Sequence, residues 1–263
     1  MTQFLPTLLI VLWAGVMIAL ERRFPYDRQP IFRRELWTDI VWFTLIFATG
    51  IGWLVATVVI PGIDHVTGWS ATRGIRSWPL AAQLGVSLLT HDLFIYGFHR
   101  AMHSNKYLWR LHECHHSVLD VDWAGGSRGQ FFENLITSTA ELAPIMLFMS
   151  PEVAFLKPVL DACWGMWIHG NVDISLGPLD YVINGPRMHR WHHSRDVHGV
   201  NFATKLAIWD WMFGTAYMPK DRKPTSYGLD EPFPTNVLKQ QVWAFRPFTP
   251  SAPPAPAPHA EQS

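Results

Sequence analysis

The feature that most constrains this chain is an apolar run at residues 40–60, in which threonines are the only polar residues. As a helix, this 21-residue run is long enough to cross the apolar core of a bilayer, which is ~30 Å thick. Inside lipid, a single segment satisfies its own backbone hydrogen bonds only as a helix. We therefore expect a transmembrane helix here, ended by Pro61 and Gly62.

Two more apolar stretches predict further spans. Residues 4–20 are uncharged and would reach ~26 Å as a helix. No Lys or Arg precedes them and no small-residue cleavage site follows, which favours an uncleaved span over a signal peptide. The stretch from Pro79 is apolar to Leu89, meets His91 and Asp92, and resumes at residues 93–98.

A fourth apolar region, residues 135–168, contains Pro144, Pro151 and Pro158. Because proline kinks or ends helices, this region is predicted to form a helical hairpin or a broken pair of spans. Glu141 lies within it, and a carboxylate at that depth is expected to face protein rather than lipid.

The positions of the arginines predict which ends of these spans face the cytoplasm. Five of them separate the first two spans, which places that loop in the cytoplasm: Arg22, Arg23, Arg28, Arg33 and Arg34. The remaining loops fit the same topology, with all histidine clusters on the cytoplasmic face. We therefore predict an all-α protein, a multi-span transmembrane helical bundle with a histidine-rich di-metal cap. Its expected parts are N-terminal helices (residues 1–78), a catalytic domain (79–246) and a disordered Pro/Ala-rich tail (247–263).

Composition supports a membrane protein and excludes some other classes. Charged residues make up 16% of the chain, against about 25% in soluble domains, and there are 14 tryptophans. The net charge is zero, which excludes a nucleic-acid binder held by bulk positive charge. Cys114 and Cys163 are too few for a disulfide scaffold.

Histidine is the residue that points to chemistry. Eight of the 13 histidines lie in three short clusters. They are His99 and His103; His112, His115 and His116; and His189, His192 and His193. Residues three or four apart share a helix face, so each cluster presents two or three imidazoles to one point.

These clusters predict a metal centre. Imidazole suits iron, zinc and copper, and eight nitrogens exceed the needs of one ion, so we expect two metals. A nitrogen-rich pair favours redox iron over calcium or magnesium. Asp92 and Tyr96 continue the helical spacing back from His99, which suggests that they orient the ligands. His65 and His259 are interpreted as ordinary structural histidines.

The clusters and their flanks resemble the fatty acid hydroxylase and sterol desaturase superfamily. The sequences H-R-A-M-H, L-H-E-C-H-H-S and H-R-W-H-H-S resemble its three histidine boxes. The similarity covers residues 84–217 and includes Asn201-Phe202 and the segment Trp209 to Thr215. It implies an integral membrane di-iron oxidase in which these eight histidines are catalytic and O2 is used to hydroxylate or desaturate a lipid.

The resemblance also extends the site. His169, in His169-Gly170-Asn171, is implied as a ninth metal ligand. Asp173 stands where some members carry another histidine, and it is expected either to bind metal or to orient a ligand. Gln130 departs from the family pattern, and the roles of His91 and His198 stay open.

The implied reaction needs partners. The substrate is a membrane lipid, which would enter through an apolar cleft for which Trp123, Phe131, Phe132 and Trp167 are candidate wall residues. Electrons would come from a separate ferredoxin, cytochrome or reductase, because these residues contain no dinucleotide or iron–sulfur motif. Zinc can replace iron in isolated protein. The lipid, the choice between hydroxylation and desaturation, and the oligomeric state stay open.

Two alternatives remain at this point. One is a zinc-dependent membrane hydrolase, because His112-Glu113-Cys114-His115-His116 fits H-E-x-x-H. The other is a metal transporter or sensor, which would place ionisable residues along a path through several spans.

Overall fold

The first two long helices are the apolar ones. In this computed structural model, which describes residues 4–248, α1 spans Leu5–Arg23. The second helix runs without a break over Thr38–Thr67 and includes α2 (Thr49–Leu54) and α3 (Ile60–Thr67). Both are long and apolar enough to cross a membrane, and only 11% and 22% of their most apolar windows are buried. Their outward faces therefore present hydrocarbon side chains.

The prediction that Pro61 ends the second helix is wrong. The helix continues to Thr67 and ends at Gly68, whose φ of 64° suits glycine. Two π-helical stretches, Thr38–Ala48 and Val55–Val59, widen this helix, and the second lies immediately before Ile60 and Pro61. Because the hydrogen-bond ladder changes register there, the missing N–H of Pro61 is accommodated without a break.

The other long helices are α4 (Leu80–Ser104), α6 (Phe131–Phe148) and α7 (Pro151–His169). The region with three prolines forms the hairpin of α6 and α7, joined at Met149 and Ser150. Pro144 and Pro158 lie inside these helices, whereas Pro151 is the first residue of α7, where its missing N–H costs nothing. His91 and Asp92 do not interrupt α4.

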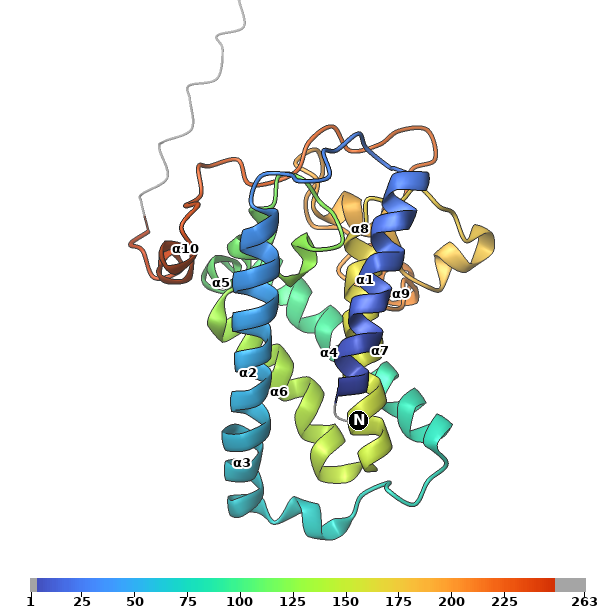
Figure 1. The fold of residues 1–263 in the computed structure, drawn as a ribbon, viewed down its shortest axis with the longest axis vertical. Coiled ribbons are helices and arrows are strands. Elements are labelled where there is room, and N and C mark those ends of the chain that lie inside the picture. Colours follow the sequence, from blue (N-terminus) through green and yellow to red (C-terminus); the bar gives the residue numbers. More distant parts are fainter. Residues whose placement is uncertain (1–3, 249–263) are drawn as a thin grey trace, which may run out of the picture.

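The long helices pack along their lengths (Figure 1). Helix α1 packs on α7, α4 contacts both helices of the hairpin, and α6 packs on the second helix. One apolar cluster joins Ile51, Val55 and Ile60 to Leu147 of α6. These contacts fix the ends of α4 and α7, which carry histidines.

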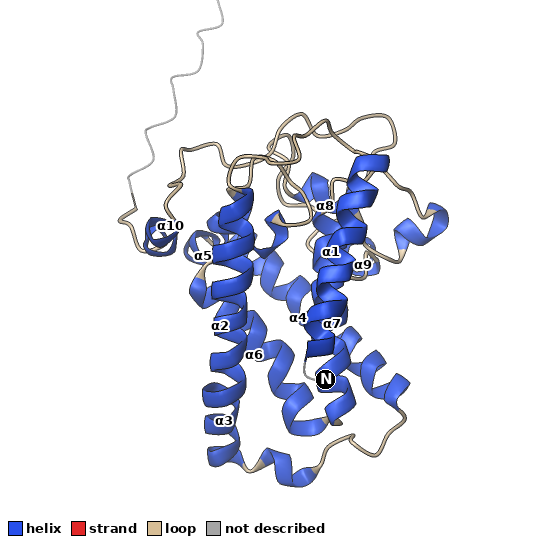
Figure 2. Ribbon diagram, viewed as in Figure 1, coloured by secondary structure: helices blue, strands red, loops and turns tan. Residues whose placement is uncertain are grey.

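Short helices and loops cover one end of this bundle (Figure 2). They include α5 (Lys106–His116), α8 (Pro186–His192), α9 (Ile208–Phe213) and α10 (Val237–Trp243). Asn105 caps α5 by accepting hydrogen bonds from the N–H groups of Tyr107 and Leu108. Of the predicted tail, only Pro247 and Phe248 are described; the rest lies outside the described residues.

A buried ionic network fastens the covering loops to the bundle. Arg33 contacts Asp39 at 2.7 Å and Asp122 at 2.6 Å, and Arg128 contacts Asp39 at 2.7 Å. These four side chains come from the loop after α1, the start of the second helix and the loops before α6. Each charge has a partner at hydrogen-bond distance, which offsets the cost of burial.

Candidate metal centre

Nine imidazoles converge where α4, α5, α7 and α8 meet, in two groups. In each group, one nitrogen of every ring lies within 4.8 Å of one nitrogen of the others. Group one consists of His99, His103, His112, His116 and His192. Group two consists of His115, His169, His189 and His193. The structure thus brings together all nine histidines predicted as ligands.

Both H-x-x-H-H clusters are divided between the groups. In α5, His112 and His116 are one turn apart and belong to group one, whereas His115 turns to group two. In the cluster at α8, His192 faces group one, whereas His189 and His193 belong to group two. The groups are neighbours, because the rings of His116 and His193 are 4.7 Å apart between centroids.

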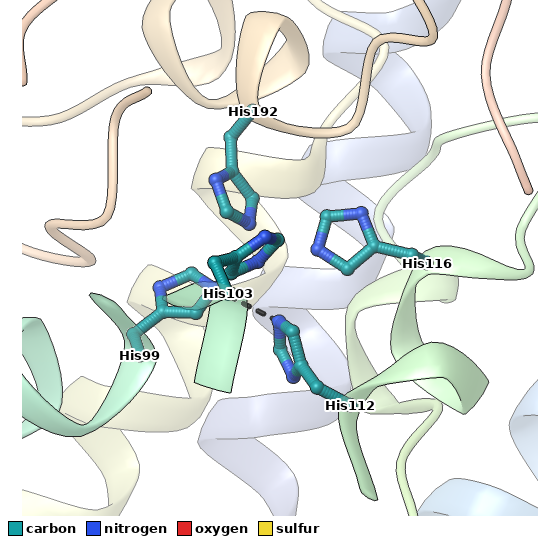
Figure 3. Close-up of side chains that lie close together, drawn as sticks. All are labelled: His99, His103, His112, His116 and His192. Atoms are coloured by element: carbon teal, nitrogen blue, oxygen red, sulfur yellow. Dashed lines mark hydrogen bonds between the residues drawn. The ribbon is translucent and has the colours of Figure 1, made fainter. Parts of the chain in front are cut away.

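Group one shows how the rings are aimed. In Figure 3, the side chains from α4, α5 and α8 point toward a common centre. The Nε2 atoms of His99 and His112 are 2.9 Å apart. In group two, His169 Nε2 lies 3.0 Å from His189 Nε2 and 3.3 Å from His115 Nε2.

The outer nitrogens of several rings are held by carbonyl oxygens. His99 Nδ1 lies 2.7 Å from the Phe202 carbonyl, and His115 Nδ1 lies 3.0 Å from that of Arg128. His169 and His192 make the same contact with the carbonyls of Gly165 and Val200. A carbonyl only accepts, so each Nδ1 carries the ring hydrogen and each Nε2 presents a bare lone pair.

This arrangement fits bound transition metals. Two pairs of bare Nε2 lone pairs, His99 with His112 at 2.9 Å and His115 with His169 at 3.3 Å, repel unless a cation lies between them. Within residues 4–248, the Nε2 atoms of His103, His116 and His192 have no hydrogen-bond partner although they are buried. Unpaired buried nitrogens are costly in an apolar interior, and metal coordination satisfies them.

The histidines of α5 and α8 are neutral, which is the form that binds metal. Burial, with a smaller contribution from the positive charge of Arg128, lowers the pKa of His115 to about 4. Burial followed by repulsion between the imidazoles lowers the pKa of five further rings well below its usual value: His112, His116, His189, His192 and His193. At neutral pH each ring therefore offers a lone pair.

Asp92 and Tyr96 act on a loop, not on the rings. The Asp92 carboxylate accepts hydrogen bonds from the backbone N–H groups of Lys205 and Leu206, both at 2.9 Å. The Tyr96 ring packs against Phe202, whose carbonyl accepts from His99. These contacts fix the 201–207 loop and, through it, one ligand ring.

Asp173 lies outside both groups. Its carboxylate pairs with Lys223 at 2.8 Å and with Arg187 at 3.7 Å on the surface, with 36% of the side chain exposed. The structure therefore does not bring Asp173 to the centre. Gln130 caps α6 by accepting the N–H of Phe132.

Sequence reasoning missed Glu133 and Gly126. Glu133 Oε1 accepts a hydrogen bond from His112 Nδ1 at 2.7 Å, which orients that ring. Gly126 lies so close to the His169 ring that a Cβ atom would overlap it. The only sequence signal for Glu133 is a carboxylate at the start of an apolar helix.

A cavity of about 320 Å³ opens beside the histidines between α4, α6 and α7. None of the four predicted wall residues lines it. Phe131 packs in the apolar cluster with Ile51, and Phe132 is exposed. Trp164 lines the cavity instead of Trp167, because residues three apart on a helix differ by about 60° in direction.

The other residues that the sequence left open belong to neither histidine group. Glu113, which completes H-E-x-x-H, is bound by Arg246 at 2.7 Å, so its carboxylate is not free to act as a general base. His198 lines a second cleft that reaches His103, His116 and His192 from the loop side. His91 lies with Glu141 and Asp161, so Glu141 faces protein as predicted.

Comparison with known proteins decides the family. The model of the family described as fatty acid hydroxylase matches residues 84–215. The chain belongs to the fatty acid hydroxylase family. This match includes all nine converging histidines.

Several curated relatives are lipid-modifying enzymes. Ornithine lipid hydroxylase OlsE of Rhizobium tropici is 31% identical over 88% of this chain and 72% of its own length. Sphinganine C4-monooxygenase 1 of Arabidopsis thaliana is 26% identical over 89% and 93%. Human alkylglycerol monooxygenase is 34% identical over 55% of this chain, but the match covers only 32% of that longer protein. No solved structure matches the chain.

These findings confirm the predicted class. As a fatty acid hydroxylase family member with relatives named as lipid hydroxylases and monooxygenases, the chain is an O2-dependent lipid hydroxylase. The zinc hydrolase and the transporter are not favoured.

Proposed function

We propose that this fatty acid hydroxylase family member holds two iron ions, one in each histidine group, and hydroxylates a membrane lipid at a C–H position. The observation that carries the proposal is the convergence of nine imidazoles in two adjacent groups, four of them oriented by backbone carbonyls. The ligands in both groups are imidazoles, and such a donor set favours iron, zinc or copper. Because the chain is an O2-dependent hydroxylase, we assign redox-active iron.

The residues of the chain would bind, orient and shield the metals. Bound iron supplies the redox chemistry that turns O2 into an oxidant of an unactivated C–H bond. The five rings of group one and the four of group two hold the ions, and the carbonyls of Phe202, Arg128 and Val200 fix ring orientation. Trp164, Ile95 and Met102 line the adjacent cavity and limit the access of water.

The proposed setting is a multi-pass membrane protein with the histidine cap at the cytoplasmic face. Support comes from the two exposed apolar helices, α1 and the second helix, and from the arginines that follow α1. We propose residues 79–246 as the catalytic domain, since α4 to α8 carry every ligand.

The substrate and the electron source complete the proposal. Relatives named for ornithine lipid, alkylglycerol and sphinganine support a polar membrane lipid as substrate, and their names support hydroxylation. Electrons would come from a ferredoxin, cytochrome or reductase outside these 263 residues. The second cleft, which reaches group one from the loop side, is the proposed approach for that donor.

Metal exchange tests the proposal. The full chain is purified in detergent, stripped with a chelator and reloaded with Fe(II) or Zn(II), and metal content and O2 uptake are measured with a mixed lipid extract and a reducing system. We expect about two metal ions per chain in both forms and lipid-dependent O2 uptake only with iron. Uptake that is equal in both forms would overturn the iron assignment, and a single ion per chain would overturn the paired centre.

A further inference from the structure

The cavity beside the histidines has a second, charged end. Its walls include His99 and His169 at one end and His91, Glu141 and Asp161 at the other. His91 precedes His99 by two turns of α4, which is ~12 Å along the helix axis. The charged end therefore lies about one lipid headgroup away from the metal centre.

The wall between the two ends is polar. Glu133, Thr137 and Glu141 follow one another at four-residue spacing on α6, and Asn134 and Ser138 lie beside them. All five line the cavity. Glu133 Oε1 already accepts from His112, and the Thr137 hydroxyl donates to backbone carbonyls, but Glu133 Oε2 and Glu141 Oε1 have no partner among the described residues. A channel for bare hydrocarbon would leave these two oxygens unsatisfied, at a cost of about 1–3 kcal/mol each.

Two buried atoms at the charged end await a partner. Among the described residues, Glu141 Oε1 and His91 Nε2 make no hydrogen bond. His91 Nδ1 lies 3.2 Å from both Lys157 Nζ and Asp161 Oδ2, so the contacts of this ring are made by Nδ1 and leave Nε2 unpaired. The charged end thus offers one unused acceptor, Glu141, beside the unpaired Nε2 of His91.

The two carboxylates at this end differ in their partners. Asp161 Oδ2 lies 2.5 Å from Lys157 Nζ and 3.5 Å from Lys205 Nζ. Glu141 forms no ion pair among the described residues, so its carboxyl group is available to a cationic group of a ligand. The two ammonium groups also oppose a metal ion here, although His91, Glu141 and Asp161 lie close enough together to hold one.

We propose that this end of the cavity binds the zwitterionic head of a polar lipid. The lipid ammonium donates to Glu141, and its anionic group accepts from Lys205. One consequence of this assignment rests on the proposed function. The lipid carbons next to the head, rather than the end of the acyl chain, lie against the histidine groups.

Binding measured on metal-free protein tests the assignment. The probes are radiolabelled Nα-palmitoyl-lysine, which is zwitterionic, its Nε-acetyl derivative, which lacks the ammonium, and N-palmitoylcadaverine, which lacks the carboxylate. With the full chain in nanodiscs, we expect Nα-palmitoyl-lysine to bind about tenfold more tightly than either analogue. Glu141→Gln should abolish the preference over the acetylated analogue, and Lys205→Met should abolish the preference over the cadaverine analogue.

The controls separate this proposal from the proposed function. Glu152→Gln, which changes an exposed carboxylate in the first turn of α7, should keep every preference. Equal binding of the three probes to the wild-type chain, or full preference retained in folded Glu141→Gln, overturns the assignment. Should a variant fail to fold, the wild-type comparison still decides. Iron content and O2 uptake are measured on separate samples, so their loss would count against the proposed function alone.

Discussion

Replacing His192 or His115 by alanine is expected to abolish lipid-dependent O2 uptake and to lower bound metal from about two ions per chain toward one. His192 belongs to group one and His115 to group two, so each change removes one lone pair from one ion. The loss of activity should exceed the ~10–100-fold effect of removing an outer hydrogen-bond partner, because a direct ligand is lost. Metal analysis and O2 uptake on purified variants measure both effects.

The matched control is His65→Ala, which removes an exposed histidine of α3 far along the chain from the centre. It should keep both metal ions and full activity. Wild-type activity together with two bound ions in either His192→Ala or His115→Ala would contradict the ligand assignment.

Asp39→Ala is expected to destabilise the fold by about 3–5 kcal/mol, because it strands buried charge. Asp39 has no exposed surface and bridges Arg33 and Arg128, which tie the loop after α1 to the loop before α6. Without the carboxylate, Arg33 keeps Asp122 and Arg128 keeps Glu35, but both guanidinium groups lose a buried partner. Denaturant unfolding in detergent, followed by tryptophan fluorescence, measures the change.

Asp230→Ala is the control for this effect. Asp230 pairs with Arg195 on the surface, where 69% of its side chain is exposed, so its loss should leave stability nearly unchanged. An Asp39→Ala variant as stable as Asp230→Ala would show that the buried network does not hold the covering loops.

The sequence was most informative where a pattern repeats. Apolar length predicts α1 and the second helix, and imidazole spacing predicts the eight clustered histidines. His169 is an isolated histidine, so only the family resemblance pointed to it. Both the three-residue and the four-residue spacing place rings on one helix face, and the structure groups His112 with His116 rather than with His115.

Tertiary packing explains what the sequence could not provide. The π-helical turn that precedes Pro61 in the second helix has no local sequence signal. Glu133 and Gly126 matter because α6 and the 125–127 turn approach His112 and His169, contacts between distant residues. The cavity wall follows the rotation of α7, which turns Trp164 inward and Trp167 away.

The most direct test of the central claim is the origin of the oxygen in the product. The iron-loaded chain is supplied with oxygen-18 gas, unlabelled water, reductant and lipid, and the product is examined by mass spectrometry. We predict a hydroxylated lipid that carries oxygen-18 from the gas, with label lost in the zinc-loaded form. A product whose new oxygen comes from water would contradict this account and would favour a zinc-dependent hydrolase instead.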